Sequence, residues 1–160
     1  MPVNILKNLS LIKTLASFFY VGYLPVAPGT WASLLAMLIW VLLPIQSAVI
    51  RTIIVSSAFL VGIYVSNLSE LRSGISDPSY VVIDEVAGMW LALLLLPRIE
   101  YPQSLIWALI AFAVFRIFDI TKVFPINKLE NMSGGFGIMM DDIAAGLFTA
   151  VLLNLFIWIF

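Results

Sequence analysis

The chain contains no cysteine and no histidine among its 160 residues, and only 11% of its residues are charged. The absence of cysteine excludes disulfides and thiol chemistry. The absence of histidine excludes phosphohistidine intermediates, histidine general bases and the usual imidazole ligands of a metal ion. Any chemistry must therefore use carboxylates, lysine, arginine, hydroxyls, backbone amides and a hard metal ion. The net charge of −1 argues against a nucleic-acid partner.

Apolar residues make up 62% of the chain, and the mean hydropathy is +1.10. An average soluble domain is about 25% charged, more than twice the value found here. No stretch alternates between apolar and polar residues as a half-buried strand would. The sequence therefore predicts an all-α fold, a polytopic integral membrane helical bundle that forms a single membrane-embedded domain over residues 1–160. We expect no cleaved signal peptide at the N-terminus.

The apolar segments are separated by prolines and short polar stretches. A membrane-spanning helix needs roughly 20 mostly apolar residues. We expect about five spans, preceded by a short re-entrant or interfacial helix over residues 15–23. The predicted spans are 30–43, 52–65, 78–96, 104–120 and 141–160.

The basic residues predict the orientation, because lysine and arginine are enriched in cytoplasmic loops. With a cytoplasmic N-terminus and five spans, only Arg51 and Arg98 fall outside. The basic residues inside are Lys7, Lys13, Arg72, Arg116, Lys122 and Lys128. On this topology, four segments that are distant in the sequence bring their polar groups to the cytoplasmic face.

The segment DPSYVVIDEVAGMW carries three acidic residues at or inside a predicted span. Asp77 followed by Pro78 is typical of a helix N-cap with proline at the first helical position. Asp84 lies two helical turns later, on the same side. A carboxylate at the bilayer centre costs about 2.5–3.5 kcal/mol, so Asp84 and Glu85 indicate function. The alternatives are a plain cap at Asp77, and a structural ion pair between the other two acids and a nearby cation.

The segment FRIFDITKVFP places Arg116, Asp119 and Lys122 at intervals of three, which forms one stripe on a helix. One interpretation is a carboxylate metal ligand flanked by two phosphate-binding cations. The alternative is a set of side chains that reach the membrane surface and mark the interface.

The segment SGGFGIMMDD joins a glycine-rich stretch to two adjacent aspartates. Either Asp141 or Asp142 can cap the last span, and the other is then surplus. Gly134 and Gly135 would let backbone amides approach an anion closely. The alternative is a cap followed by a flexible turn. In the segment PGT, Thr30 can cap a helix or contribute to an anion site, and the spacing alone favours the cap.

Clustered carboxylates without histidine or cysteine are hard oxygen ligands, which suit Mg²⁺. Arginine, lysine and glycine amides suit a phosphate group. Because these groups are predicted at the depth of the lipid head groups, the sequence indicates Mg²⁺-dependent chemistry on a lipid phosphate.

Four segments in order resemble the phosphatidylglycerophosphatase A family: LPVAPGTWASL, DPSYVVIDEVAGMW, FRIFDITKVFPI and GGFGIMMDDIAAG. The resemblance covers about residues 18–150. Val123 stands where the family usually has proline, and Ala32 where it often has glycine. The resemblance implies Mg²⁺-dependent removal of the terminal phosphate of phosphatidylglycerophosphate. It also implies bacterial phosphatidylglycerol synthesis at the cytoplasmic face of the inner membrane.

On this resemblance we assign hypothetical roles to the polar residues of the four segments. The metal ligands would be Asp84, Glu85, Asp141 and Asp142. The catalytic residues would be Asp84, Glu85, Asp119 and Asp142, with Asp77 structural or secondary. The phosphate-binding residues would be Thr30, Arg116, Lys122, Gly134 and Gly135. The nucleophile is either a water activated by the metal or an aspartate, and we favour water.

Two other functions remain as alternatives. A membrane phosphotransferase acting on a CDP-linked lipid would need a DG-x2-AR…G-x3-D-x3-D pattern, which the sequence lacks. A transporter would place its carboxylates near the membrane midplane between internal repeats. The sequence shows no such repeat, and its charges gather at one predicted face.

Overall fold

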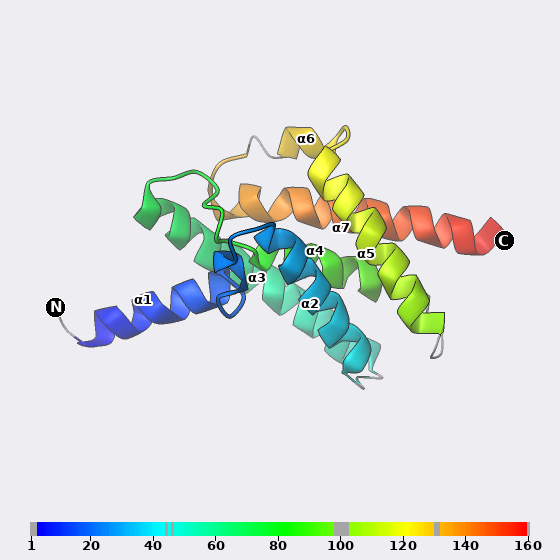
Figure 1. Ribbon diagram of the computed structural model, residues 1–160, viewed down its shortest axis with the longest axis horizontal. Coiled ribbons are helices and arrows are strands. Elements are labelled where there is room, and N and C mark those ends of the chain that lie inside the picture. The colour runs from blue at the N-terminus through cyan, green and yellow to red at the C-terminus, as the bar shows by residue number, and fades with distance from the viewer. Residues whose placement is uncertain (1–2, 44, 46, 98–102, 130–131, 160) are drawn as a thin grey trace.

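The computed structural model describes residues 3–43, 45, 47–97, 103–129 and 132–159. Within these ranges the chain is helical and contains no strand, which confirms the predicted all-α class. The elements are α1 (Val3–Ala16), the 3₁₀ helix η1 (Val21–Tyr23), α2 (Pro28–Leu42), α3 (Ala48–Ser73), α4 (Ile83–Leu94), α5 (Gln103–Thr121), α6 (Ile126–Leu129) and α7 (Gly134–Ile159). The start of α1 and the end of α7 lie at opposite ends of the long axis (Figure 1).

Three of the described helices, α3, α5 and α7, are long and apolar enough to cross a membrane. α2 has 15 residues and α4 has 12. At 1.5 Å per residue, α4 extends about 18 Å, less than the roughly 30 Å hydrocarbon core of a bilayer. The prediction of five spans is therefore not confirmed.

Helix α4 is the centre of the bundle. It packs against α7, α3, α2 and α5 (Figure 1). Eight of its 12 residues are buried. A helix that is apolar on almost every side must be enclosed by other elements, and this accounts for the central place of α4. The two acidic residues in its first turn, Asp84 and Glu85, are therefore held inside protein.

The backbones of α4 and α7 approach closely at two glycines. A Cβ atom added to Gly88 would lie 2.5 Å from the backbone oxygen of Asp142. A Cβ atom added to Gly146 would lie 3.0 Å from the carbonyl carbon of Gly88. Only glycine permits this spacing at either position. The contact fixes Asp84, one turn before Gly88, beside Asp142.

The N-terminal part differs from the prediction of one short helix over residues 15–23. Helix α1 ends at Ala16, and η1 follows a turn in which Phe18, Phe19 and Tyr20 all have positive φ. The turn is tied to the loop before α4, because Val82 N donates to the oxygen of Ala16 at 2.9 Å. This segment therefore braces the chain immediately before Asp84.

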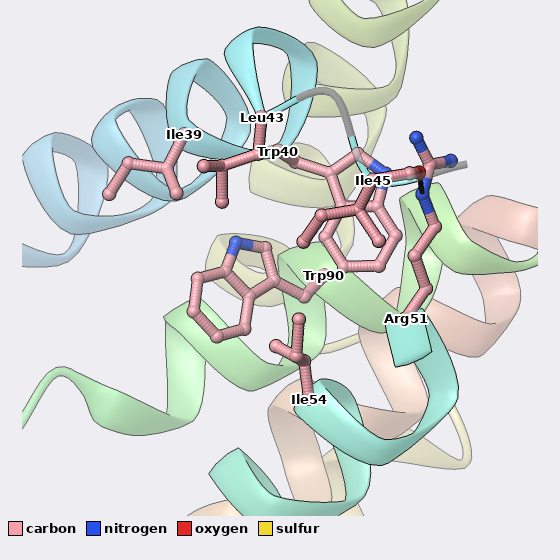
Figure 2. A pocket seen from close by; sticks show the side chains of 7 residues that line it. All are labelled: Ile39, Trp40, Leu43, Ile45, Arg51, Ile54 and Trp90. Carbon is pink, nitrogen blue, oxygen red and sulfur yellow. Dashed lines mark hydrogen bonds between the residues drawn. The ribbon is translucent and has the colours of Figure 1, made fainter. Parts of the chain in front are cut away.

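A small apolar pocket, about 30 Å³ in volume, lies between the end of α2, the start of α3 and Trp90 of α4 (Figure 2). The rings of Trp40 and Trp90 lie beside each other there, with centroids 6.3 Å apart and planes tilted by 33°. The guanidinium carbon of Arg51 lies 5.2 Å from the Trp40 ring centroid, and its Nε donates to the Ile45 oxygen at 2.7 Å. Apart from Arg51, the described residues that line this pocket are apolar, and they pack the end of α2 against α3 and α4.

Candidate active site

Three carboxylates from two helices meet in the interior of the bundle. Asp84 and Glu85 come from the first turn of α4, and Asp142 comes from α7. Each offers one oxygen, and these oxygens all lie within 4.8 Å of one another. Asp84 is 7% exposed and Asp142 is 3% exposed, so water screens this cluster poorly.

Each of the three carboxylates also has a buried oxygen without a hydrogen-bond partner among the described residues. These atoms are Asp84 Oδ1, Glu85 Oε2 and Asp142 Oδ1. Buried polar atoms are normally satisfied, and unpaired charges are costly to bury. Oxygen atoms from two or three carboxylates are the ligands that hard divalent cations prefer. The cluster therefore fits a hard divalent metal ion.

Asp141, the fourth predicted ligand, lies outside this cluster of three. Its Oδ2 accepts a hydrogen bond from Lys122 Nζ at 2.9 Å, and its Oδ1 accepts one from the Asp142 amide at 3.0 Å. Asp141 thus joins the carboxylate cluster, through the Asp142 amide, to the Lys122 ammonium.

Arg116 borders the cluster from α5. Its Nη1 donates to Asp119 Oδ2 and to Ser33 Oγ, the latter at 3.4 Å. Arg116 and Asp119 side chains are 15% and 14% exposed, which does not fit the alternative of charges that reach the membrane surface. Asp119 lies close enough to the cluster to repel both Glu85 and Asp142 electrostatically, and its side chain is within hydrogen-bonding reach of Asp142.

One alternative is a structural ion pair between Asp84 or Glu85 and one of the nearby cations. The structure gives both of these cations other acidic partners. Arg116 pairs with Asp119, and Lys122 pairs with Asp141. Both cations therefore lie near the carboxylate cluster, and each is ion-paired with an acid beside it. Asp84, Glu85 and Asp142 each retain a buried oxygen that could bind a ligand.

The prediction that Asp77 and Pro78 begin a helix is wrong. Helix α4 begins at Ile83, with Val82 as its N-cap, and Asp77 lies in the preceding loop with φ of 48°. The backbone after Pro78 forms a turn instead, because the Val81 amide donates to the Pro78 oxygen at 2.8 Å. Asp77 is still close enough to Asp84 to repel it electrostatically.

The start of α2 also differs from the expected cap at Thr30. The helix begins at Pro28, its N-cap is Ala27 with φ of 47°, and Thr30 is half-buried inside the first turn. The residue of this turn that reaches the carboxylate cluster is Gly29, which packs against Glu85. The sequence analysis missed this contact, and also the contact of Ser33 with Arg116, because each joins residues far apart in the sequence that no local pattern connects.

The predicted glycine loop before the paired aspartates is helical. α7 begins at Gly134, so Asp141 and Asp142 lie two turns inside the helix and neither caps it. The Gly135 amide donates to Asn67 Oδ1 at 3.4 Å. A Cβ atom at Gly135 would lie 2.6 Å from the Asn67 backbone nitrogen, so this glycine allows α7 to pack closely on α3.

Comparison with known proteins gives a consistent result over almost the whole chain. The family model of phosphatidylglycerophosphatase A matches residues 14–157. A phosphatidylglycerophosphatase A of Haemophilus influenzae is 37% identical over 153 residues, which are 92% of this chain and 91% of that protein. The protein of the same name from Escherichia coli is 35% identical over 140 residues, 87% of this chain and 79% of the relative.

A third relative carries a different name. A Bacteroides thetaiotaomicron protein, provisionally named phosphatidylinositol-3-phosphatase, is 40% identical over 143 residues, 86% of this chain and 88% of the relative. No solved structure matches the chain significantly. The family match and the two relatives named phosphatidylglycerophosphatase A cover the segments that carry the carboxylate cluster. The chain therefore belongs to the phosphatidylglycerophosphatase A family of lipid phosphatases.

Proposed function

We propose that the protein hydrolyses the terminal phosphomonoester of phosphatidylglycerophosphate, which gives phosphatidylglycerol and inorganic phosphate. The observation that supports this most strongly is the cluster of Asp84, Glu85 and Asp142, with a buried unpaired oxygen on each residue. Membership of the family suggests the substrate. The reaction would serve bacterial phospholipid synthesis at the cytoplasmic face of the inner membrane, the face that the basic residues favour.

Asp84, Glu85 and Asp142 would hold Mg²⁺. When bound, the ion supplies positive charge that stabilises the charge developing on the phosphoryl oxygens. The interior position of α4 helps, since electrostatic interactions are stronger where water is excluded. Asp119 and Asp141 are ion-paired with Arg116 and Lys122, and they would act by orienting these cations.

Arg116 and Lys122 would bind the phosphate of the substrate. Asp119 and Ser33 both accept hydrogen bonds from Arg116 Nη1, so the guanidinium is fixed before substrate arrives. Asp141 holds the Lys122 ammonium in the same way. Pre-oriented donors lower the barrier because they need no rearrangement during the reaction. A water molecule would attack phosphorus, with one carboxylate of the site accepting its proton, while the bond between phosphorus and the glycerol oxygen breaks. The glycerol oxygen would take up a proton and leave as a hydroxyl group of phosphatidylglycerol.

A second candidate substrate is phosphatidylinositol 3-phosphate, which the name of the Bacteroides relative suggests. Both lipids present a phosphomonoester on a polyol head group, and the same cation and metal site would serve either. The two head groups that carry the phosphate differ in size. The rate of phosphate release from each lipid therefore distinguishes the two candidate substrates.

The test is the release of inorganic phosphate from each lipid in mixed micelles, with Mg²⁺ and with EDTA. We expect release from phosphatidylglycerophosphate that requires Mg²⁺ and that falls at least about 10²-fold in Asp84→Asn. Glu70→Gln is the control, because Glu70 is a carboxylate of α3 outside the cluster. Faster release from the inositol lipid would replace the proposed substrate. Absence of release from both, with folded protein, would contradict the phosphatase function.

A further inference from the structure

The first turn of α2 meets the Glu85 carboxylate at a residue with no side chain. A Cβ atom added to Gly29 would overlap Glu85 Oε1 and lie 2.8 Å from Glu85 Cδ. It would also lie 3.4 Å from Arg116 Nη1. Gly29 is buried, and the atoms that an added methyl group would meet first belong to the end of the Glu85 side chain. The space that a side chain would fill at position 29 is thus the space that the carboxylate occupies.

This glycine is not explained by its backbone conformation. Gly29 lies within α2 and is not among the residues with positive φ, whereas Gly74 and Gly134 are. Glycine in a helix interior costs roughly 1 kcal/mol relative to alanine, and glycine at the second residue of α2 is still less favourable for the helix than alanine. The contact with Glu85 supplies a reason for it.

The start of α2 also contacts Arg116, the cation beside Glu85. Ser33 lies one turn after Gly29 and is fully buried. Its Oγ donates to the Gly29 oxygen at 2.7 Å and accepts a hydrogen bond from Arg116 Nη1. The hydroxyl thereby joins the backbone of Gly29 to the guanidinium. One helical turn therefore touches an acidic residue of the carboxylate cluster and the cation beside it.

We propose that Gly29 is a positioning residue, whose missing side chain lets the Glu85 carboxylate lie against α2 and reach Asp84 and Asp142. The metal-binding part of this inference rests on the proposed function. The steric part does not, because it concerns only the contact between Gly29 and Glu85.

The first experiment measures Mn²⁺ binding by electron paramagnetic resonance, with Mn²⁺ replacing Mg²⁺ as a spectroscopic probe. We expect Gly29→Ala to weaken Mn²⁺ binding at least about tenfold, the range typical of residues that orient metal ligands. Glu85→Asp shortens the carboxylate side chain and makes room for the added methyl group. The double variant Gly29→Ala with Glu85→Asp should therefore bind Mn²⁺ more tightly than Gly29→Ala alone. A double variant that is as weak as, or weaker than, Gly29→Ala would overturn the inference.

Gly62→Ala is the matched control. It also adds a methyl group to a buried helical glycine, but that group would meet the flexible end of Met139 rather than a carboxylate. We expect Mn²⁺ affinity in this variant to remain within about threefold of wild type, well short of the loss given for residues that orient ligands. A loss equal to that of Gly29→Ala would show that any added methyl group disturbs the site, and would overturn the specific role of Gly29.

A stability measurement covers the case in which Gly29→Ala folds poorly or the protein binds no metal. In the presence of EDTA, Gly29→Ala should lower the Tm by at least about 3 °C when Glu85 is present. In a Glu85→Ala background the same change should cost little or nothing, because the obstructing carboxylate is gone. Wild-type protein that binds no Mn²⁺ would contradict the proposed function while this cycle still tests the contact. An equal loss in both backgrounds would overturn the inference.

Discussion

Lys122 Nζ lies 2.9 Å from Asp141 Oδ2 and joins the end of α5 to α7 beside the carboxylate cluster. Lys122 has φ of 42°, a left-handed conformation that lysine adopts at a cost, and its amide donates to the Phe118 oxygen at 2.9 Å. The ordinary occupant of such a helix end is glycine or asparagine. A lysine at this position brings its ammonium to Asp141 of α7. We infer that this ion pair offsets the cost of the left-handed backbone.

Lys122→Asn should therefore relax the backbone and still lower stability and activity, because Asp141 loses its ion pair. Asparagine adopts the left-handed conformation readily, so strain is not a cause of any loss. A double-mutant cycle of Lys122→Asn and Asp141→Asn should give a coupling free energy of roughly 0.5–3 kcal/mol. The measurement is reversible unfolding in detergent. Additive effects of the two changes would show that the pair contributes nothing to folding.

Asp142→Asn should separate stability from function. Burial and the neighbouring Asp119, Asp84 and Asp141 all oppose a charge on Asp142, so an uncharged asparagine suits the site better when no cation is bound. In EDTA we expect a Tm that rises by about 2–4 °C, which corresponds to about 1 kcal/mol for a chain of this size. Activity should fall by at least about 10²-fold.

The check on this prediction is a pair of unfolding curves with EDTA and with excess Mg²⁺. Mg²⁺ should raise the Tm of wild type, because a ligand that binds only the folded state stabilises it. It should have little effect on the variant. If the variant is less stable than wild type in EDTA, the Asp142 carboxylate stabilises the fold through its contacts, and the expected destabilising effect of this buried acid is wrong.

The sequence predicts the chemistry of this site better than its geometry. The carboxylates Asp84, Glu85 and Asp142 are recognisable because charged residues are rare in an apolar chain, and the structure brings the three together. The helices α2 and α5 begin and end within a few residues of their predicted bounds. These features depend on local composition and periodicity, which a single sequence contains.

The errors come from contacts between distant segments. Asp77 followed by Pro78 is locally a good helix start, but hydrogen bonds to Pro78 and Ala16 delay α4 until Ile83. The predicted loop at Gly134 is helical because α7 packs against α3 at Gly135. No local pattern records these partners, and the same is true of the contact between Gly29 and Glu85.

Gly88→Ala should damage the site without touching a carboxylate. The added methyl group would lie 2.5 Å from the Asp142 backbone oxygen and 2.9 Å from a ring carbon of Phe115, which is fully buried. α4 and α7 must then separate, at a cost of about 1–3 kcal/mol for overpacking. The separation would move Asp84 from Asp142 and weaken metal binding. Titration calorimetry with Mg²⁺ checks this, and unchanged affinity would show that the helix spacing does not govern the cluster.

The orientation in the membrane can be tested directly, because the chain has no cysteine and a single introduced thiol is unique. Helix α3 has 26 residues and extends about 39 Å, enough to cross the bilayer. The distribution of basic residues predicts that α3 begins outside and ends in the cytoplasm. Ala48 and Ser73 lie at its two ends and are both exposed. In intact cells a membrane-impermeant maleimide should label Ala48→Cys and leave Ser73→Cys unlabelled until the membrane is opened. Labelling of Ser73→Cys from outside would invert the topology and place the carboxylate cluster on the opposite side from the proposed one.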